Sequence, residues 1–117
     1  MLKKIKNETG LKIVTGERQF GVYHYIETLI AEAVDIFNPD IAGVGGIIDF
    51  LKIAELSNKK EVKVTPHCWN SMSIAASAML HVCKSSPNPE MAEFFRLERH
   101  ALPGLGMRQR ERRRVET

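Results

Sequence analysis

NPDIAGVGG, residues Asn38–Gly46, joins a short apolar segment to a sequence with helical spacing. The apolar segment Val34–Phe37 is interrupted only by Asp35, and Asp40 follows it closely. Three glycines then lead into Ile47–Ala54, where apolar residues recur as they do on one side of a helix. A strand, a glycine turn and a helix make one βα unit. Asp40 is therefore a candidate site residue, because α/β proteins carry their chemistry at the carboxyl ends of strands.

The rest of the chain repeats this alternation. Short segments rich in β-branched residues predict three buried strands, at Leu11–Thr15, Val34–Phe37 and Val62–Thr65. Helical spacing follows each of them, over residues 22–33, 47–56 and 74–82. A last apolar piece, Met91–Phe95, predicts a short fourth strand. The pattern indicates an α/β fold with a parallel sheet and crossover helices.

An ionisable residue stands at the end of each predicted strand or within it. These residues are Glu17, Asp40, His67 and Glu93. Taken singly, each is as well explained by an ordinary surface position beside a turn. Four in sequence indicate one site built from consecutive βα loops, because the carboxyl ends of parallel strands meet at one edge of the sheet.

Length and composition fit one globular domain or part of a larger one. The chain has 117 residues, of which 44% are hydrophobic and 26% charged. Its two cysteines, Cys68 and Cys83, make no disulfide framework and no metal-ligand spacing. The N-terminus has no signal-peptide core, and no apolar run approaches the roughly 20 residues of a membrane span. A soluble, cytoplasmic protein is expected.

The net charge of +3 is concentrated at the chain ends. Five arginines lie between Arg108 and Arg114, and residues 107–117 are predicted to form a basic, disordered tail. A basic tail can bind nucleic acid. No aromatic residue is interleaved here and no nucleic-acid-binding motif accompanies it, so a solvated tail is the favoured interpretation.

Six segments together resemble one known family. They are VTGER (Val14–Arg18), NPDIAGVGG, KIAELS (Lys52–Ser57), VTPHCWNS (Val64–Ser71), IAASAMLHV (Ile74–Val82) and SPNPEMAEFF (Ser86–Phe95). In order and spacing, over roughly residues 5–106, the chain is similar to the enolase superfamily, mandelate racemase/muconate lactonizing enzyme subgroup. The resemblance implies that residues 1–106 are the C-terminal half of a (β/α) TIM-type barrel, with about four parallel strands alternating with helices in an incomplete barrel.

The resemblance also implies roles for the strand-end residues. Glu17 stands where the family has a carboxylate ligand of Mg²⁺, and a hard oxygen ligand suits that ion. His67 stands at the position of the catalytic base, and Asp40 at that of the carboxylate that orients it. Glu93 matches a glutamate that contacts the substrate carboxylate or enolate oxygen, although Glu90, three residues earlier, offers another register.

Two neighbours of these residues, Arg18 and Trp69, are possible pocket residues. The family's capping domain and the first half of its barrel have no counterpart in the chain, and with them go two metal carboxylates. The chain therefore resembles a truncated fragment with an incomplete Mg²⁺ site. We expect it to be marginally stable, and to associate with a copy of itself or with another half-barrel, because four strands leave two open edges.

Three functions remain open at this point. The first is a Mg²⁺-dependent acid-sugar dehydratase, which removes the proton α to a carboxylate and then eliminates water. The second, in the same family, is a racemase or epimerase of 2-hydroxy acids. The third is a catalytically inactive fragment or split subunit, in line with the missing ligands. The partner implied by the first two is a small carboxylate substrate.

Overall fold

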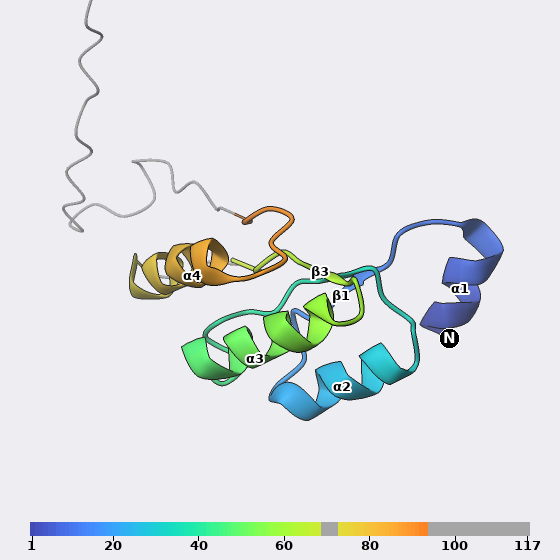
Figure 1. Cartoon of the computed structure of the whole chain (residues 1–117), viewed down its shortest axis with the longest axis horizontal. Coiled ribbons are helices and arrows are strands. Elements are labelled where there is room, and N and C mark those ends of the chain that lie inside the picture. The colour runs from blue at the N-terminus through green and yellow to red at the C-terminus, as the bar shows by residue number, and fades with distance from the viewer. Residues whose placement is uncertain (69–72, 94–117) are drawn as a thin grey trace, which may run out of the picture.

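The structure, a computed structural model, describes residues 1–68 and 73–93 of the chain. Its elements are α1 (Leu2–Thr9), β1 (Val14–Thr15), α2 (Val22–Ile30), β2 (Ile36–Phe37), α3 (Ile47–Asn58), β3 (Lys63–Val64) and α4 (Ser73–Ser85). The three strands form one parallel sheet in the order β1-β2-β3. Helices α2 and α3 pack together along one face of the sheet, and α4 packs against α3 (Figure 1). The predicted α/β fold with parallel strands is confirmed, and the sheet is unclosed.

The core lies between the sheet and its helices. In the strand register, Thr15 pairs with Phe37, and Phe37 with Val64. Phe37 and Val64 are 0% and 1% exposed, and the same cluster contains Tyr25 of α2 and Phe50 of α3. Because side chains alternate along a strand, the neighbouring positions face the other way.

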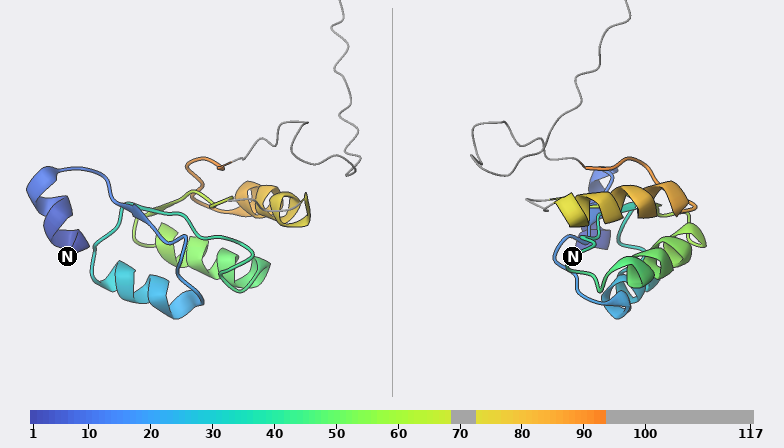
Figure 2. Two further views of the ribbon diagram at one scale, coloured as in Figure 1. Left: turned by 180° about the vertical axis from the view of Figure 1, so that it is seen from behind. Right: turned by 90° about the vertical axis from the view of Figure 1, so that its left-hand side faces the viewer.

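The opposite face of the sheet carries Val14, Ile36 and Lys63, which form the other line of the register. Val14 is 53% exposed and Lys63 is exposed as well. The views in Figure 2 show the same one-sided layering, with the four helices leaving this face without a helical layer. Exposed apolar side chains on this face would favour self-association, which stays a prediction.

The order of elements is as predicted, but their limits differ. Each strand has two residues rather than four or five. β1 starts late because the Ile13 N–H donates to the Asp35 carboxylate, at 2.8 Å, instead of to a ladder carbonyl. α2 stops at Ile30 rather than at residue 33, since Glu32 has a left-handed φ of 52°. α3 and α4 are longer than predicted.

The fourth strand was predicted at Met91–Phe95, and its start was wrong. The chain returns to β3 earlier: the Val64 N–H donates to the Asn88 carbonyl at 3.1 Å, and the Glu90 N–H to the Val64 carbonyl at 2.9 Å. These two hydrogen bonds make an isolated parallel β-bridge between Val64 and Pro89. Proline has no N–H for a ladder, which limits regular pairing there. Residues 94 and 95 lie outside the described residues.

Helix α1 was not predicted. It stands apart from the other helices at one end of the molecule (Figure 2) and buries none of its residues. Two ion pairs attach it: Lys3 to Glu32 at 3.0 Å and Lys6 to Asp35 at 2.8 Å. The Lys6 ammonium and the Ile13 N–H hold the pKa of the Asp35 carboxyl below its usual value, and hydrogen bonding from Lys3 lowers the pKa of Glu32.

We predict that acid detaches α1. A carboxylate with a lowered folded-state pKa contributes stability above its unfolded pKa, near 4, and loses it as pH falls through the folded value. In amide NMR spectra, α1 signals should lose their native shifts below about pH 4, while those of Phe37 and Phe50 persist.

Asp35→Asn should produce the same change at neutral pH, whereas Glu8→Gln should not. Among the described residues, Glu8 forms an ion pair only with Lys4, inside α1. Simultaneous loss of α1 and core signals on acidification would contradict the prediction.

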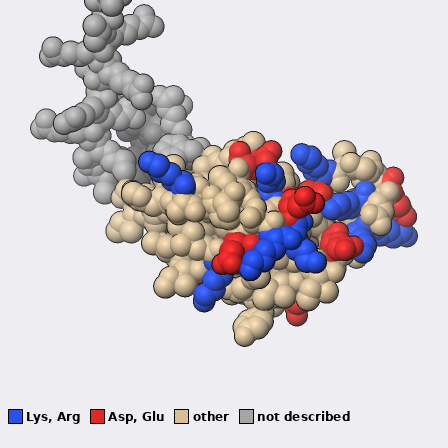
Figure 3. All heavy atoms as spheres, viewed as in Figure 1, with Lys and Arg blue, Asp and Glu red and all other residues tan. Residues whose placement is uncertain are grey.

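Charged side chains of both signs share the molecular surface. On the face drawn in Figure 3, Lys and Arg lie beside Asp and Glu rather than in a single basic patch. Within residues 1–68 and 73–93, none of the helices has the length and apolar character that crossing a membrane requires. The predicted boundary at residue 106 and the arginine-rich tail lie outside the described residues.

Candidate active site

The loop after β1 brings Glu17 to the carboxyl end of the sheet. Gly16 has a φ of +131°, and a Cβ there would lie 3.0 Å from the ring of Tyr25. The Tyr25 hydroxyl donates to the Gly16 carbonyl at 2.6 Å and to the Gln19 carbonyl at 3.2 Å. Burial, together with the charge of Asp40, raises the pKa of Tyr25 above its usual range. The phenol therefore stays protonated and acts as the donor that fixes this loop.

We predict that Tyr25→Phe lowers the free energy of unfolding by about 1–3 kcal/mol, because two carbonyls lose a buried donor. Tyr23→Phe is the matched control, since Tyr23 is 82% exposed on the same helix. Urea unfolding of the two variants measures the difference. Equal unfolding free energies would show that the hydroxyl does not hold the loop.

Asp40 is fixed by the turn that follows β2. Its Oδ1 accepts the Ala42 N–H at 2.8 Å, and its backbone carbonyl accepts the Val44 N–H at the same distance. Pro39, which precedes Asp40, is fully buried. The other carboxylate oxygen, Oδ2, is left free to face the next strand.

His67 occupies that next strand end. The backbone N–H of His67 donates to the Pro39 carbonyl at 3.0 Å. His67 also forms a parallel bridge with Asp40, just beyond the ends of β2 and β3. The Nδ1 atom lies 3.2 Å from Asp40 Oδ2, and the side chain is 16% exposed. The structure thus brings together the two residues predicted as base and orienting carboxylate, through the pairing of neighbouring parallel strands.

Two further carboxylates approach the other ring nitrogen. His67 Nε2 lies 3.4 Å from Glu17 Oε2 and 3.8 Å from Glu93 Oε2. The Cys68 N–H donates to Glu93 Oε2 at 2.9 Å and so fixes that glutamate. A positive charge on the ring would lie among three carboxylates, which is a favourable arrangement. Sequence reasoning missed the anchoring role of the Cys68 N–H, because a backbone donor leaves no signal in residue type.

The two predicted pocket residues are not equally placed. Arg18 Nε lies 3.4 Å from Glu17 Oε1, but the arginine side chain is 91% exposed and makes no other ion pair among the described residues. Trp69 lies outside the described residues. Both pocket roles stay predictions, as does the choice of Glu93 over Glu90. Of these two glutamates, Glu93 is the one that lies within ion-pair distance of His67 in the described part of the chain.

The carboxylate oxygens around His67 are the candidate ligands for a metal ion. Mg²⁺ requires near-octahedral coordination by several oxygen atoms. In residues 1–68 and 73–93, no group of three His, Cys, Asp or Glu side chains is placed to hold a metal. Glu17 turns one oxygen to His67 and the other to Arg18. The described residues therefore do not make a Mg²⁺ site by themselves.

Comparison with known families decides what this arrangement belongs to. A family model described as enolase C-terminal domain-like matches residues 1–113. The chain belongs to the enolase superfamily. The predicted subgroup, of mandelate racemase and muconate lactonizing enzyme type, is confirmed.

Enzymes and solved structures of this superfamily match most of the chain. The D-galactonate dehydratase of Ralstonia pickettii is 36% identical over 90 residues, or 77% of the chain. The D-galactarolactone cycloisomerase of Agrobacterium fabrum is 34% identical over 86 residues, or 74% of the chain. The crystal structure of an enolase from Sargasso Sea environmental DNA superimposes with a TM-score of 0.77 at 53% identity, covering 80% of this chain and 25% of that one.

This superfamily member thus matches only part of its relatives. It spans 23% of the length of each of the two curated enzymes. The sheet described above corresponds to the C-terminal part of their barrels.

Proposed function

We propose that this chain carries the proton-transfer residues of an acid-sugar dehydratase, and that they act within a complete barrel. The observation that supports the proposal is the His67–Asp40 pair, in which Nδ1 and Oδ2 lie 3.2 Å apart on adjacent strand ends. Relatives that match this segment are a dehydratase and a cycloisomerase of sugar-acid derivatives. The substrate would be a sugar acid, and the first bond to break would be the C–H bond α to its carboxylate.

His67 would be the base. A carboxylate can only accept a hydrogen bond, so in the pair with Asp40 the ring proton must be on Nδ1. That leaves the lone pair on Nε2 to take the α-proton. The imidazolium that forms would then be stabilised by Asp40 on one side and by Glu17 on the other.

The second half of the reaction follows from the electrons released at the α-carbon. They form a carbon–carbon double bond as the β-hydroxyl leaves, with a proton, as water. The resulting enol becomes a 2-keto-3-deoxy acid. We assign Glu93 to contact with the substrate carboxylate or enolate oxygens, because the Cys68 N–H aims its carboxylate at the space beside His67.

A divalent metal ion would bind at a site for which this chain supplies only part of the ligands. We propose that Glu17 supplies one oxygen to a divalent ion and that its other ligands lie outside the described residues. We predict that Mg²⁺ leaves the thermal unfolding midpoint of this chain unchanged, since a ligand stabilises only what it binds. A midpoint that rises and saturates with Mg²⁺ would contradict this.

Racemisation is the second candidate, because the same base can return a proton to the α-carbon. Membership of the mandelate racemase and muconate lactonizing enzyme subgroup favours keeping it. A chain that is inactive alone is compatible with either chemistry, and we propose that the isolated chain does not turn over sugar acids.

The test is a chimera in which this chain replaces the matching segment of the Ralstonia pickettii D-galactonate dehydratase. In heavy water, the chimera should exchange the α-proton of D-galactonate and form a 2-keto-3-deoxy acid, whereas the isolated chain should do neither. Exchange with inversion and no keto product would favour the racemase. A chimera with native-like unfolding and no exchange would overturn the assignment of the base.

A further inference from the structure

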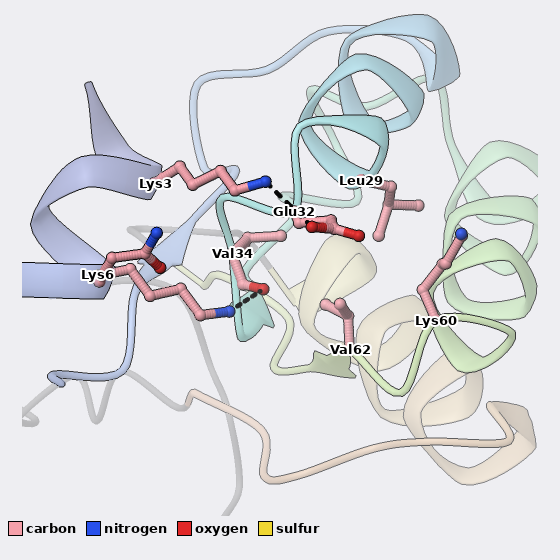
Figure 4. A pocket seen from close by; sticks show the side chains of 8 residues that line it. Lys3, Lys6, Leu29, Glu32, Val34, Lys60 and Val62 are labelled. Atoms are coloured by element: carbon pink, nitrogen blue, oxygen red, sulfur yellow. Dashed lines mark hydrogen bonds and ion pairs between the residues drawn. The ribbon is translucent and has the colours of Figure 1, made fainter.

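A hollow lies at the opposite end of the sheet from His67. It has a volume of about 360 Å³, within the usual range of small-molecule pockets. Its lining comes from four separate segments: Lys3, Lys6 and Asn7 of α1, Leu29 and Glu32 at the end of α2, Val34 before β2, and Lys60 and Val62 before β3. Figure 4 shows α1 on one side of this pocket and Lys60 on the other.

The pocket has an apolar floor. Leu29, Val34 and Val62 are 7%, 3% and 8% exposed and belong to the same core cluster as Phe37. Their remaining surface faces the hollow, where they offer contact to a hydrocarbon group and no hydrogen bond.

The rim is cationic. Lys3 donates to Glu32 at 3.0 Å, and Lys6 is occupied by Asp35 at 2.8 Å and by the Val34 carbonyl at 3.4 Å. Lys60 is outside the ion pairs found in the described part of the chain. Three ammonium groups thus face two carboxylates, those of Glu32 and Asp35, which leaves one surplus positive charge beside apolar surface.

We propose that this pocket binds a small organic carboxylate that carries a short apolar group. Its carboxylate would lie near Lys60 and accept from the free N–H groups of Lys60 and Lys3, and its apolar group would cover Val34 and Val62. Glu32 shows that a carboxylate is tolerated between these lysines, and all three lower its pKa. Inorganic phosphate fits less well, because the apolar floor offers nothing to its oxygens.

The test uses the full chain, labelled with ¹⁵N, and pentanoate as the probe. Pentanoate should shift the backbone amides of Glu32, Val34 and Val62 in a saturable way in the millimolar range. Acetate and inorganic phosphate, which lack the apolar group, should bind more weakly. Equal responses to all three anions, or shifts spread over every exposed lysine, would overturn the proposal.

Variants of the rim separate the pocket from general surface charge. Lys60→Gln should weaken pentanoate binding about two- to fivefold, the range of one exposed ion pair. Lys59→Gln is the matched control and should change nothing, since the adjacent Lys59 pairs with Glu55 on α3.

Glu32→Gln should act in the other direction. It keeps an acceptor for Lys3 and removes the competing charge, so pentanoate should bind more tightly. Equal weakening by Lys60→Gln and Lys59→Gln would show non-specific charge association and overturn the proposal, as would equal affinity in Lys60→Gln and the unmodified chain.

Discussion

His67→Asn is expected to reduce α-proton exchange by the chimera about 10²–10⁴-fold, the usual contribution of a general base. Asparagine can keep a hydrogen bond to Asp40 but has no nitrogen lone pair that takes up a proton. The loss should appear in the rate of deuterium incorporation into D-galactonate, with unfolding of the chimera unchanged. Because His67 is mostly buried between neighbouring strand ends, no other described histidine can replace it.

Two further variants test whether the loss is specific to His67 and how much Asp40 contributes to it. His81→Asn on the exposed side of α4 should leave exchange unaltered. Asp40→Asn should lose about 10- to 150-fold, which corresponds to one hydrogen bond to a charged group. Exchange that survives in His67→Asn, or a larger loss in Asp40→Asn than in His67→Asn, would contradict the assignment of His67 as the base and of Asp40 as its orienting partner.

The sequence predicted the meeting of Asp40 and His67 for a general reason. Consecutive strands of a parallel sheet end at the same edge, so residues just after Phe37 and Val64 had to be neighbours once the strands were located. Glu93 followed from the same reasoning, although the segment before it meets β3 in an isolated bridge rather than in a regular strand. The alternation of strands and helices therefore predicted the fold and the meeting of these residues, while their roles came from the resemblance to the enolase superfamily.

What the sequence did not predict depends on backbone conformation. The direction of Glu17 rests on the left-handed Gly16 and on the Tyr25 hydroxyl, and the direction of Glu93 rests on the Cys68 N–H. Neither bond has a residue pattern that reveals it. The pocket under α1 is another such case, because the Lys3–Glu32 pair closes it across 29 residues of sequence.

Phe37→Ala is expected to destabilise the chain by about 3–5 kcal/mol, the cost of removing a buried aromatic ring. Phe37 is 0% exposed on the central strand, and its ring meets that of Tyr25 edge-on at 5.0 Å. Small domains have only about 5–15 kcal/mol to lose. A three-stranded sheet with one uncovered face should lie near the lower end of that range, so much of the variant should be unfolded at 25 °C in the absence of denaturant.

Phe20→Ala is the control that makes this measurement specific to the core. Phe20 is 66% exposed, and substitutions at exposed positions usually change stability by less than about 0.5 kcal/mol. Urea unfolding followed by circular dichroism should therefore place Phe20→Ala with the unmodified chain and Phe37→Ala far below both. Coincident curves for the two alanine variants would mean that the ring of Phe37 is not enclosed. The packing of Phe37 would then no longer explain the position of Asp40, because β2 leads into the turn that carries Asp40.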